Sequence, residues 1–92
     1  MLSRSVKVAN RLGLHARAAA RFVHLASRFQ SHVEVSRGSQ TMDGKSIMGI
    51  LLLAAATGTV LTVTTDGEDE QAALDALCGL IEAGFGEDTC SA

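Results

Sequence analysis

The sequence predicts an α+β domain in which three helices cover one face of a four-stranded antiparallel sheet. Two observations support this fold class. Segments with apolar residues at every second position, typical of half-buried strands, alternate with segments whose apolar residues recur every three or four positions, typical of helices. The segments follow the order β-α-β-β-α-β-α, and helices with one apolar stripe pack on alternating strands as two layers. The expected architecture is therefore an open-faced two-layer sandwich.

The first half of the chain shows both patterns. Residues 5–8 alternate polar and apolar side chains and predict a strand, and residues 10–13 form a loop. Two short strands are expected over residues 32–36 and 40–42, joined by a Gly-Ser turn. Between the loop and the second strand, a helix begins at Ala16. Its inner face is predicted to contain Ala19, Phe22, Ala26 and Phe29.

The second half supplies the other helices and the fourth strand. Ser46 opens an apolar segment over residues 47–56, whose alanines and unbranched side chains favour a helix that Gly58 ends. Residues 59–65 are rich in β-branched side chains and predict a strand. An acidic cluster over residues 66–70 then lies where a helix start favours negative charge. The inner face of the last helix is predicted to contain Ala73, Leu74, Leu77, Leu80 and Ile81.

The chain length of 92 residues suits one domain, expected over residues 1–86, with a flexible tail over 87–92. The longest apolar run, residues 50–56, is far shorter than the ~20 residues that cross a bilayer. Since the N-terminus also lacks the apolar core of a signal peptide, we expect a cytoplasmic protein without membrane insertion. Cys78 and Cys90 are expected to be a small buried side chain and a free tail thiol rather than a disulfide.

The charges are unevenly distributed along the chain. The net charge of −2 gives no support to nucleic-acid binding. Residues 1–46 hold eight basic and two acidic side chains, a net charge of +6, whereas residues 47–92 hold eight acidic and no basic ones, a net charge of −8. This split predicts a polarised surface that attracts an acidic partner or anionic ligand, unless folding mixes the two halves. His15, His24 and His32 lack the spacing of a compact ligand set, so neither a metal site nor a cofactor is expected.

The segment GLHAR, residues 13–17, contains the strongest candidate for chemistry. His15 lies where a loop becomes a helix, so the first backbone N–H groups have no intrahelical partners and the helix dipole is positive there. A phosphoryl group on the imidazole would lie over the N–H groups of Ala16 and Arg17, and the Arg17 guanidinium could add a charge-assisted hydrogen bond. The residues alone also allow a simpler interpretation, in which His15 is a helix cap or an ordinary surface residue.

A second segment, DGKSIMG over residues 43–49, places Ser46 at the start of the short helix. Helix capping alone would explain why a serine occupies this position. The alternative is a phosphorylation site, because a helix N-terminus tolerates a phosphoserine that adds about two negative charges. Ile47, Met48 and Leu51 are expected to leave an apolar patch beside it that suits docking, while some of these side chains must face the core instead.

Together these segments resemble the HPr family, the histidine-containing phosphocarriers of the bacterial sugar phosphotransferase system. The stretch GLHAR resembles the active-site motif of that family, GKSIMG over residues 44–49 resembles its regulatory serine segment, and GEDE over residues 67–70 resembles the lead-in to its last helix. The segments occur in the order and spacing of the family. The resemblance covers roughly residues 3–84.

The resemblance implies that His15 accepts a phosphoryl group from Enzyme I, which takes it from phosphoenolpyruvate, and passes it to sugar-specific IIA domains. Arg17 would position that group, and Ser46 would be the target of an ATP-dependent HPr kinase/phosphorylase whose action weakens docking to Enzyme I. The protein would be a carrier with a phosphohistidine intermediate, not a stand-alone enzyme. The implied partner surface contains Leu14, Ala20, Arg21, His24, Ile47, Met48 and Leu51.

Two features depart from the commonest pattern of the family. Ala18 stands where many members have proline, and residues 84–92 extend beyond a minimal HPr. They leave open whether the protein acts in sugar uptake or is a mainly regulatory relative, such as a carrier of the nitrogen-related phosphotransfer chain. A third alternative is an α/β binding module without phosphotransfer, in which His15 would be dispensable.

Overall fold

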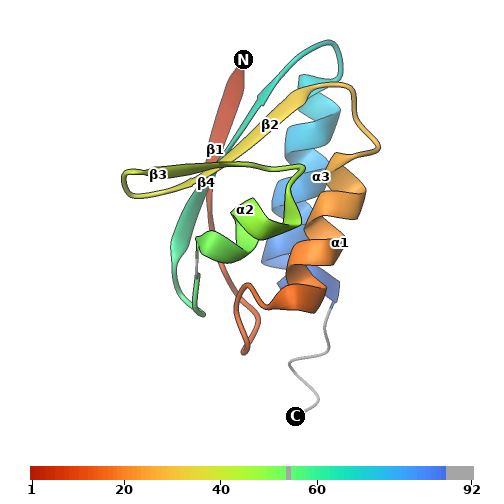
Figure 1. The fold of residues 1–92 in the computed structure, drawn as a ribbon. Helices are drawn as coiled ribbons and strands as arrows, with labels where there is room; N and C mark the ends of the chain where they lie inside the picture. The colour runs from red at the N-terminus through yellow and green to blue at the C-terminus, as the bar shows by residue number, and fades with distance from the viewer. Residues whose placement is uncertain (54, 87–92) are drawn as a thin grey trace.

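A computed structural model describes residues 1–53 and 55–86 and confirms the predicted fold class (Figure 1). Four strands form one antiparallel sheet in the order β1-β4-β2-β3, and helices α1, α2 and α3 cover one of its faces. The strands are β1 (Leu2–Lys7), β2 (His32–Arg37), β3 (Gln40–Asp43) and β4 (Val60–Asp66). The helices are α1 (Ala16–Ala26), α2 (Ile47–Leu52), α3 (Glu70–Glu82) and the short 3-10 turn η1 (Gly84–Gly86). The tail predicted over residues 87–92 lies outside the described residues.

The core lies between the sheet and the helices. Along β2 and β4 every second side chain is buried, as the alternation of apolar residues predicted. Cys78 lies in this core as a free thiol, and burial raises the pKa of that thiol, which confirms its predicted role as a small buried side chain. Cys90 lies outside the described residues. The buried side chains of α1 are Ala18, Ala19, Phe22, Val23 and Ala26.

Helix α1 ends before Phe29, which the sequence placed on its inner face. The backbone N–H groups of Arg28 and Phe29 donate to carbonyl groups only three residues back, at 3.1 and 3.2 Å. This tighter turn closes the helix at Ala26. Phe29 is therefore half-buried in the connection to β2 instead of lying within the helix.

Helix α2 is also shorter than predicted, since it ends at Leu52 and not at residue 56. The carbonyl of Ala55 accepts a hydrogen bond from the N–H of Leu14 at 2.8 Å, which takes the chain out of helical pairing. Arg37 donates to the carbonyl of Leu53 at 2.7 Å and so satisfies an acceptor at the end of the helix. In α3, Leu80 was predicted to lie on the inner face but is only half-buried.

Asp69 joins the connection between α1 and β2 to the start of α3. Its carboxylate accepts hydrogen bonds from the backbone N–H groups of Gln30 and Ser31, each at 2.9 Å, and from the Ser31 hydroxyl. The Ser31 hydroxyl, followed by the Gln30 N–H, lowers the pKa of Asp69 because these donors favour the ionised carboxylate. The residue is the N-cap of α3, yet its side chain makes no cap hydrogen bond to that helix. Its carboxylate instead binds the connection between α1 and β2.

The hydrogen bonds of Asp69 predict a specific loss of stability in acid. A lowered pKa stabilises the fold fully above the pKa of the unfolded chain, about 3.9, and this contribution is lost as the pH falls through the lower folded-state value. Asp69→Asn should lower the Tm at neutral pH and flatten the fall in Tm below about pH 4, as measured by circular dichroism. Glu68→Gln, which neutralises an exposed carboxylate in the same connection, is the matched control. Superimposable Tm-against-pH curves for Asp69→Asn and the parent would contradict this assignment.

Candidate functional site

His15 is the N-cap residue of α1, as predicted. Its backbone is extended, with φ −95° and ψ 178°, and its carbonyl accepts the first helical hydrogen bond, from the N–H of Ala19 at 2.9 Å. The N–H groups of residues 16–18 therefore precede the first helical bond and lie at the positive end of the helix dipole. No acidic residue lies in this first turn. The imidazole is half-buried at a helix start that favours an anion.

The loop that leads into His15 is held by hydrogen bonds to the connection between α2 and β4. The Leu14 N–H donates to the Ala55 carbonyl at 2.8 Å, and the Thr57 hydroxyl donates to the carbonyls of Asn10 and, at 2.9 Å, Arg11. Within the loop, the Asn10 amide donates to the Gly13 carbonyl at 2.7 Å. Gly13 adopts a φ of +66°, in the left-handed region that favours glycine. These contacts fix where the helix begins and hence where His15 lies.

Basic side chains line the exposed part of α1 and the turn after it. Arg17, Arg21, His24 and Arg28 are all exposed and are spaced by four, three and four residues, which places them along one stripe of the helix. The acidic cluster of residues 66–70 lies in the β4–α3 connection, at the opposite end of the molecule from the start of α1 (Figure 1). The start of α1 is thus kept apart from the acidic cluster, whereas the end of α1 approaches it, because Asp69 accepts hydrogen bonds from Gln30 and Ser31. Arg4 of the basic half also pairs with Asp75 of the acidic half at 2.9 Å, so folding mixes the two charge signs in part.

Ser46 is the N-cap residue of α2, as predicted. Its hydroxyl accepts a hydrogen bond from the Gly49 N–H at 3.1 Å, and its carbonyl accepts one from the Ile50 N–H at 3.0 Å. The neighbouring Lys45 ammonium donates to the carbonyl of Phe29 at 2.8 Å and so ties this helix start to the end of α1. Helices α1 and α2 are packed neighbours, so Ser46 and His15 begin adjacent helices.

The surface at the start of α1 and along α2 differs in part from the prediction. Met48, 67% exposed, and Ile47 are surface residues as expected. Leu14 is only 8% exposed, because its side chain packs in the core, and Leu51 is half-buried against the core. These two residues therefore lie beneath the surface to which the sequence assigned them. The predicted surface residues on α1 are Ala20, which is half-buried, and Arg21 and His24, which are exposed.

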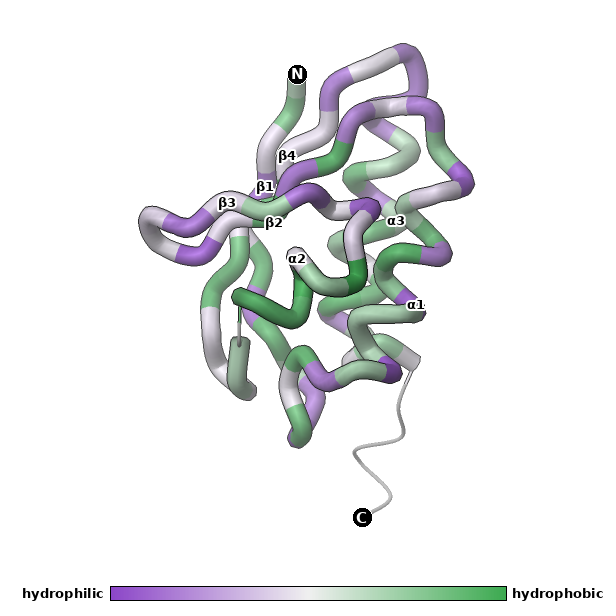
Figure 2. Tube along the Cα trace, viewed as in Figure 1, coloured by the Kyte–Doolittle hydropathy of each residue, from purple (hydrophilic) through white to green (hydrophobic). Residues whose placement is uncertain are grey.

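Two exposed leucines were missed by the sequence analysis. Leu12, 72% exposed, lies in the loop before His15, and Leu52, 60% exposed, lies on α2. Leu52 follows Met48 by four residues, so the helical period alone would have placed both on one face. Figure 2 shows α2 as hydrophobic along most of its length. Ile47, Met48 and Leu52 form what we term the α2 patch.

No group of three or more histidine, cysteine, aspartate or glutamate side chains that could hold a metal ion occurs within residues 1–53 and 55–86. In these same residues, no helix combines the length and the apolar character needed to cross a membrane.

The chain is similar to known proteins in both sequence and fold. The chain matches the family described as "PTS HPr component phosphorylation site" over residues 2–83. It is 52% identical to the phosphocarrier protein HPr of Cupriavidus necator over 95% of this chain and 98% of that protein. It is 41% identical to the phosphocarrier protein NPr of Shewanella violacea over 94% of each chain. The crystal structure of HPr-C-His from Thermoanaerobacter tengcongensis superposes with a TM-score of 0.91 at 42% identity, over 96% of this chain and 99% of that one.

The open-faced sandwich and the match to phosphocarrier sequences together define a small phosphocarrier. Both the match over most of the chain and the identity to relatives along nearly their full length support this class. The chain belongs to the HPr family of phosphocarriers of the phosphotransferase system. This confirms the resemblance drawn from the segments around His15 and Ser46.

Proposed function

We propose that His15 accepts a phosphoryl group from phosphorylated Enzyme I in the cytoplasm and passes it to a IIA domain of the sugar phosphotransferase system. In the first transfer, a ring nitrogen of His15 forms the new P–N bond as the bond between phosphorus and the donor breaks. In the second transfer, this P–N bond breaks as phosphorus forms a bond to the accepting group of the IIA domain. The observation that supports the proposal most is the position of His15 as the N-cap of α1, followed by a turn without acidic residues.

The helix start would stabilise the phosphoryl group without trapping it. The backbone N–H groups of Ala16 and Arg17 precede the first helical hydrogen bond and can donate to phosphate oxygens. The helix dipole contributes about 0.3–1 kcal/mol and a charged contact to Arg17 about 1.5–3 kcal/mol. Stabilisation of this size suits a carrier, which must both accept and release the group.

The partners would dock on the face formed by the start of α1 and the exposed side of α2. The exposed Arg21 and His24 offer positive charge on α1, and the α2 patch offers apolar area beside it. An apolar centre with a charged rim is typical of transient protein interfaces. Ser46 lies at the edge of this face as the cap of α2, where we propose that an HPr kinase/phosphorylase modifies it.

The experiment that tests the proposal supplies the full chain with phosphoenolpyruvate, Mg²⁺ and Enzyme I. Mass spectrometry should detect one added phosphoryl group, labile in acid and stable in base, as expected for a phosphoramidate. Adding a sugar-specific IIA domain should then remove it. A chain that gains no phosphoryl group under conditions in which an HPr control is labelled would overturn the proposal.

A regulatory phosphocarrier without a role in sugar uptake is the second candidate. The similarity to the NPr protein, which extends along 94% of both chains, is the observation that favours it. Offering the phosphorylated chain a sugar-specific IIA domain and a nitrogen-related one in parallel separates the candidates. Faster transfer to the sugar-specific domain supports the first, and faster transfer to the other supports the second.

Ser46→Asp should slow the phosphorylation of His15 by Enzyme I about tenfold while leaving the fold intact. An aspartate can accept the hydrogen bond of the Gly49 N–H in place of the serine hydroxyl, so the cap is kept. The added negative charge would repel an acidic partner and resist desolvation at the shared face, and about 1.4 kcal/mol of such repulsion is a factor of ten. The rate of transfer from Enzyme I is the quantity to measure.

Ser46→Asn is the control for this substitution, because it keeps a capping side chain of the same shape without the charge. Its rate should stay close to that of the parent. If Asn and Asp slowed the transfer equally, the effect would come from the side-chain geometry. Equal rates for Asp and the parent would mean that Ser46 acts only as a cap.

A further inference from the structure

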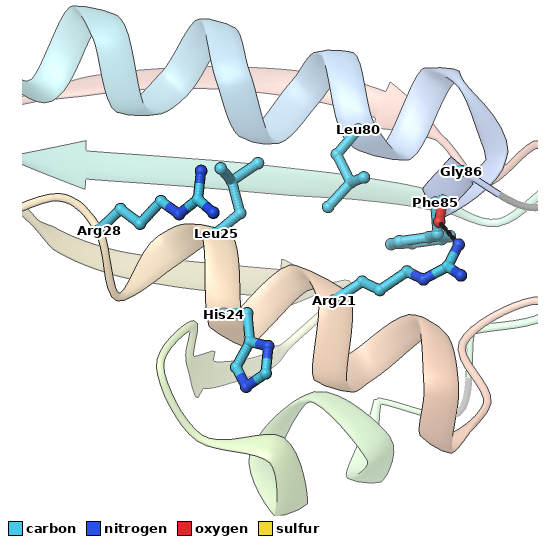
Figure 3. Close-up of a pocket in the computed structure, with 7 residues that line it drawn as sticks. All are labelled: Arg21, His24, Leu25, Arg28, Leu80, Phe85 and Gly86. Atoms are coloured by element: carbon cyan, nitrogen blue, oxygen red, sulfur yellow. Dashed lines mark hydrogen bonds between the residues drawn. The ribbon is translucent and has the colours of Figure 1, made fainter.

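A groove runs between α1 and α3 on the side of α1 that faces away from α2 (Figure 3). Its volume is about 300 Å³. One wall consists of Arg21, His24, Leu25 and Arg28, from α1 and the turn after it. Leu80 of α3 forms the opposite wall, and Phe85 and Gly86 of η1 close one end.

The bottom of the groove is apolar and fixed. Leu25 and Leu80 are both half-buried and pack against the core, so each keeps part of its side chain exposed in the groove. Phe85 is fully buried and adopts a φ of +59°, a left-handed conformation that is uncommon for a bulky residue. Residues hold such a conformation only where their surroundings enforce it, so the end wall is a preformed feature.

The rim of the groove is positively charged. The Arg21 guanidinium donates to the Phe85 carbonyl at 2.7 Å, which holds it at the end of the groove and uses one of its five N–H donors. Arg28 lies at the other end, and both guanidinium groups appear along the groove in Figure 3. Among residues 1–53 and 55–86, the ion pairs form elsewhere, between Arg4 and Asp75, between His32 and Glu34, and at the N-terminal amine.

We infer that this groove binds an acidic peptide segment of a partner protein, with one leucine or phenylalanine side chain between Leu25 and Leu80. Carboxylates on either side of that side chain would pair with Arg21 and Arg28, whose charges lie at the two ends of the apolar floor. The volume is at the lower limit of ligand pockets, which suits a single side chain better than a cofactor. A simple anion would contact only the two guanidinium groups. The apolar floor between them favours an occupant that also carries an apolar side chain.

The inference goes beyond phosphoryl transfer, because the groove contains neither His15 nor the α2 patch. Arg21 and His24 belong both to its wall and to the proposed docking face, whereas Leu25, Arg28, Leu80, Phe85 and Gly86 belong to the groove alone. It can therefore be tested on the full unphosphorylated chain. The probe is the blocked peptide EELFEE, added to the ¹⁵N-labelled chain while amide chemical shifts are recorded. We expect the amides of Leu25, Arg28, Leu80 and Gly86 to shift, with a dissociation constant of about 1 mM or lower.

Two control peptides separate the contributions of charge and apolar contact. KKLFKK reverses the charge and EEGGEE removes the apolar side chains, and both should bind at least about fivefold more weakly. Arg28→Gln should weaken the binding of EELFEE by about five- to tenfold, and Leu80→Asn by a similar factor. Lys7→Gln, which removes an exposed positive charge from β1, should leave binding unchanged.

Four outcomes would overturn the inference. The first is the absence of shifts at the groove amides with millimolar peptide. The second is binding of EEGGEE as tight as that of EELFEE, and the third is an equal loss of affinity in Lys7→Gln and Arg28→Gln. The fourth is binding seen only after removal of residues 87–92, which would mean that the chain's own C-terminal segment occupies the groove. Since none of these readouts uses Enzyme I, they are independent of the proposed phosphocarrier role.

Discussion

Replacing His15 by alanine is expected to abolish phosphorylation of the chain by Enzyme I. The imidazole is the nucleophile of the proposed reaction, and no other histidine lies at the start of α1 to take its place. Labelling from phosphoenolpyruvate should fall by at least a factor of about 10³, the scale of losing a nucleophile that acts as the covalent acceptor. The measurement is the acid-labile phosphoryl group per chain, determined by mass spectrometry at neutral pH.

The other histidines of the chain provide the controls. His24 lies in the last turn of α1 and His32 begins β2, where its ring lies 3.4 Å from the Glu34 carboxylate. His24→Ala and His32→Ala should each retain the full phosphoryl content at the end of the reaction. His24→Ala should slow the reaction modestly if that residue belongs to the docking face. Labelling of His15→Ala to the level of the parent would exclude His15 as the acceptor.

The sequence predicted the fold and the helix starts at His15 and Ser46 because local signals and packing agree there. The alternation in β2 and β4 and the caps at His15 and Ser46 depend on neighbours within a few residues. Propensity and periodicity report such short-range features. These parts of the prediction are confirmed for that reason.

The predictions that were wrong depend on contacts between distant segments. Residues 53–56 favour a helix by composition, but the Ala55 carbonyl pairs with Leu14, 41 residues earlier in the chain. Leu14 is itself buried in the core, at 8% exposure. In a similar way, Asp69 holds the N–H groups of residues 30 and 31, which its position near a helix start did not reveal. Tertiary hydrogen bonds of this kind leave no periodic signal in the sequence.

The groove between α1 and α3 shows the same limit. Leu80 was predicted to lie on the inner face of α3, because its position fits the helical spacing of the apolar residues in that helix. Whether such a residue is covered depends on how closely the neighbouring helix approaches, which the period does not determine. Leu80 is half-buried and lines the groove opposite Leu25 as a result. The end wall formed by η1 was not predicted either.

The contact between the His15 loop and Ala55 leads to the second large effect, on stability. Gly13→Ala should lower the free energy of unfolding by about 2–5 kcal/mol. A Cβ atom at Gly13 would lie 2.4 Å from the Ala55 carbonyl oxygen and 2.9 Å from the Ala56 Cα, both of which are backbone atoms that cannot rotate away. The left-handed φ of +66° adds its own cost of about 1–2 kcal/mol for a residue with a side chain. Urea denaturation, followed by circular dichroism, measures the loss.

Gly38→Ala is the matched control, since Gly38 has a φ of +59° but no heavy atom within 4 Å of the added Cβ. It should lose only the conformational cost, about 1–2 kcal/mol. The difference between the two variants therefore measures the contact with Ala55 itself. Because Leu14 donates to that same carbonyl at 2.8 Å, displacing the loop should also move the helix start and slow phosphorylation of His15 in Gly13→Ala alone. Equal losses of stability in the two variants, with equal transfer rates, would mean that the loop is not held by this contact.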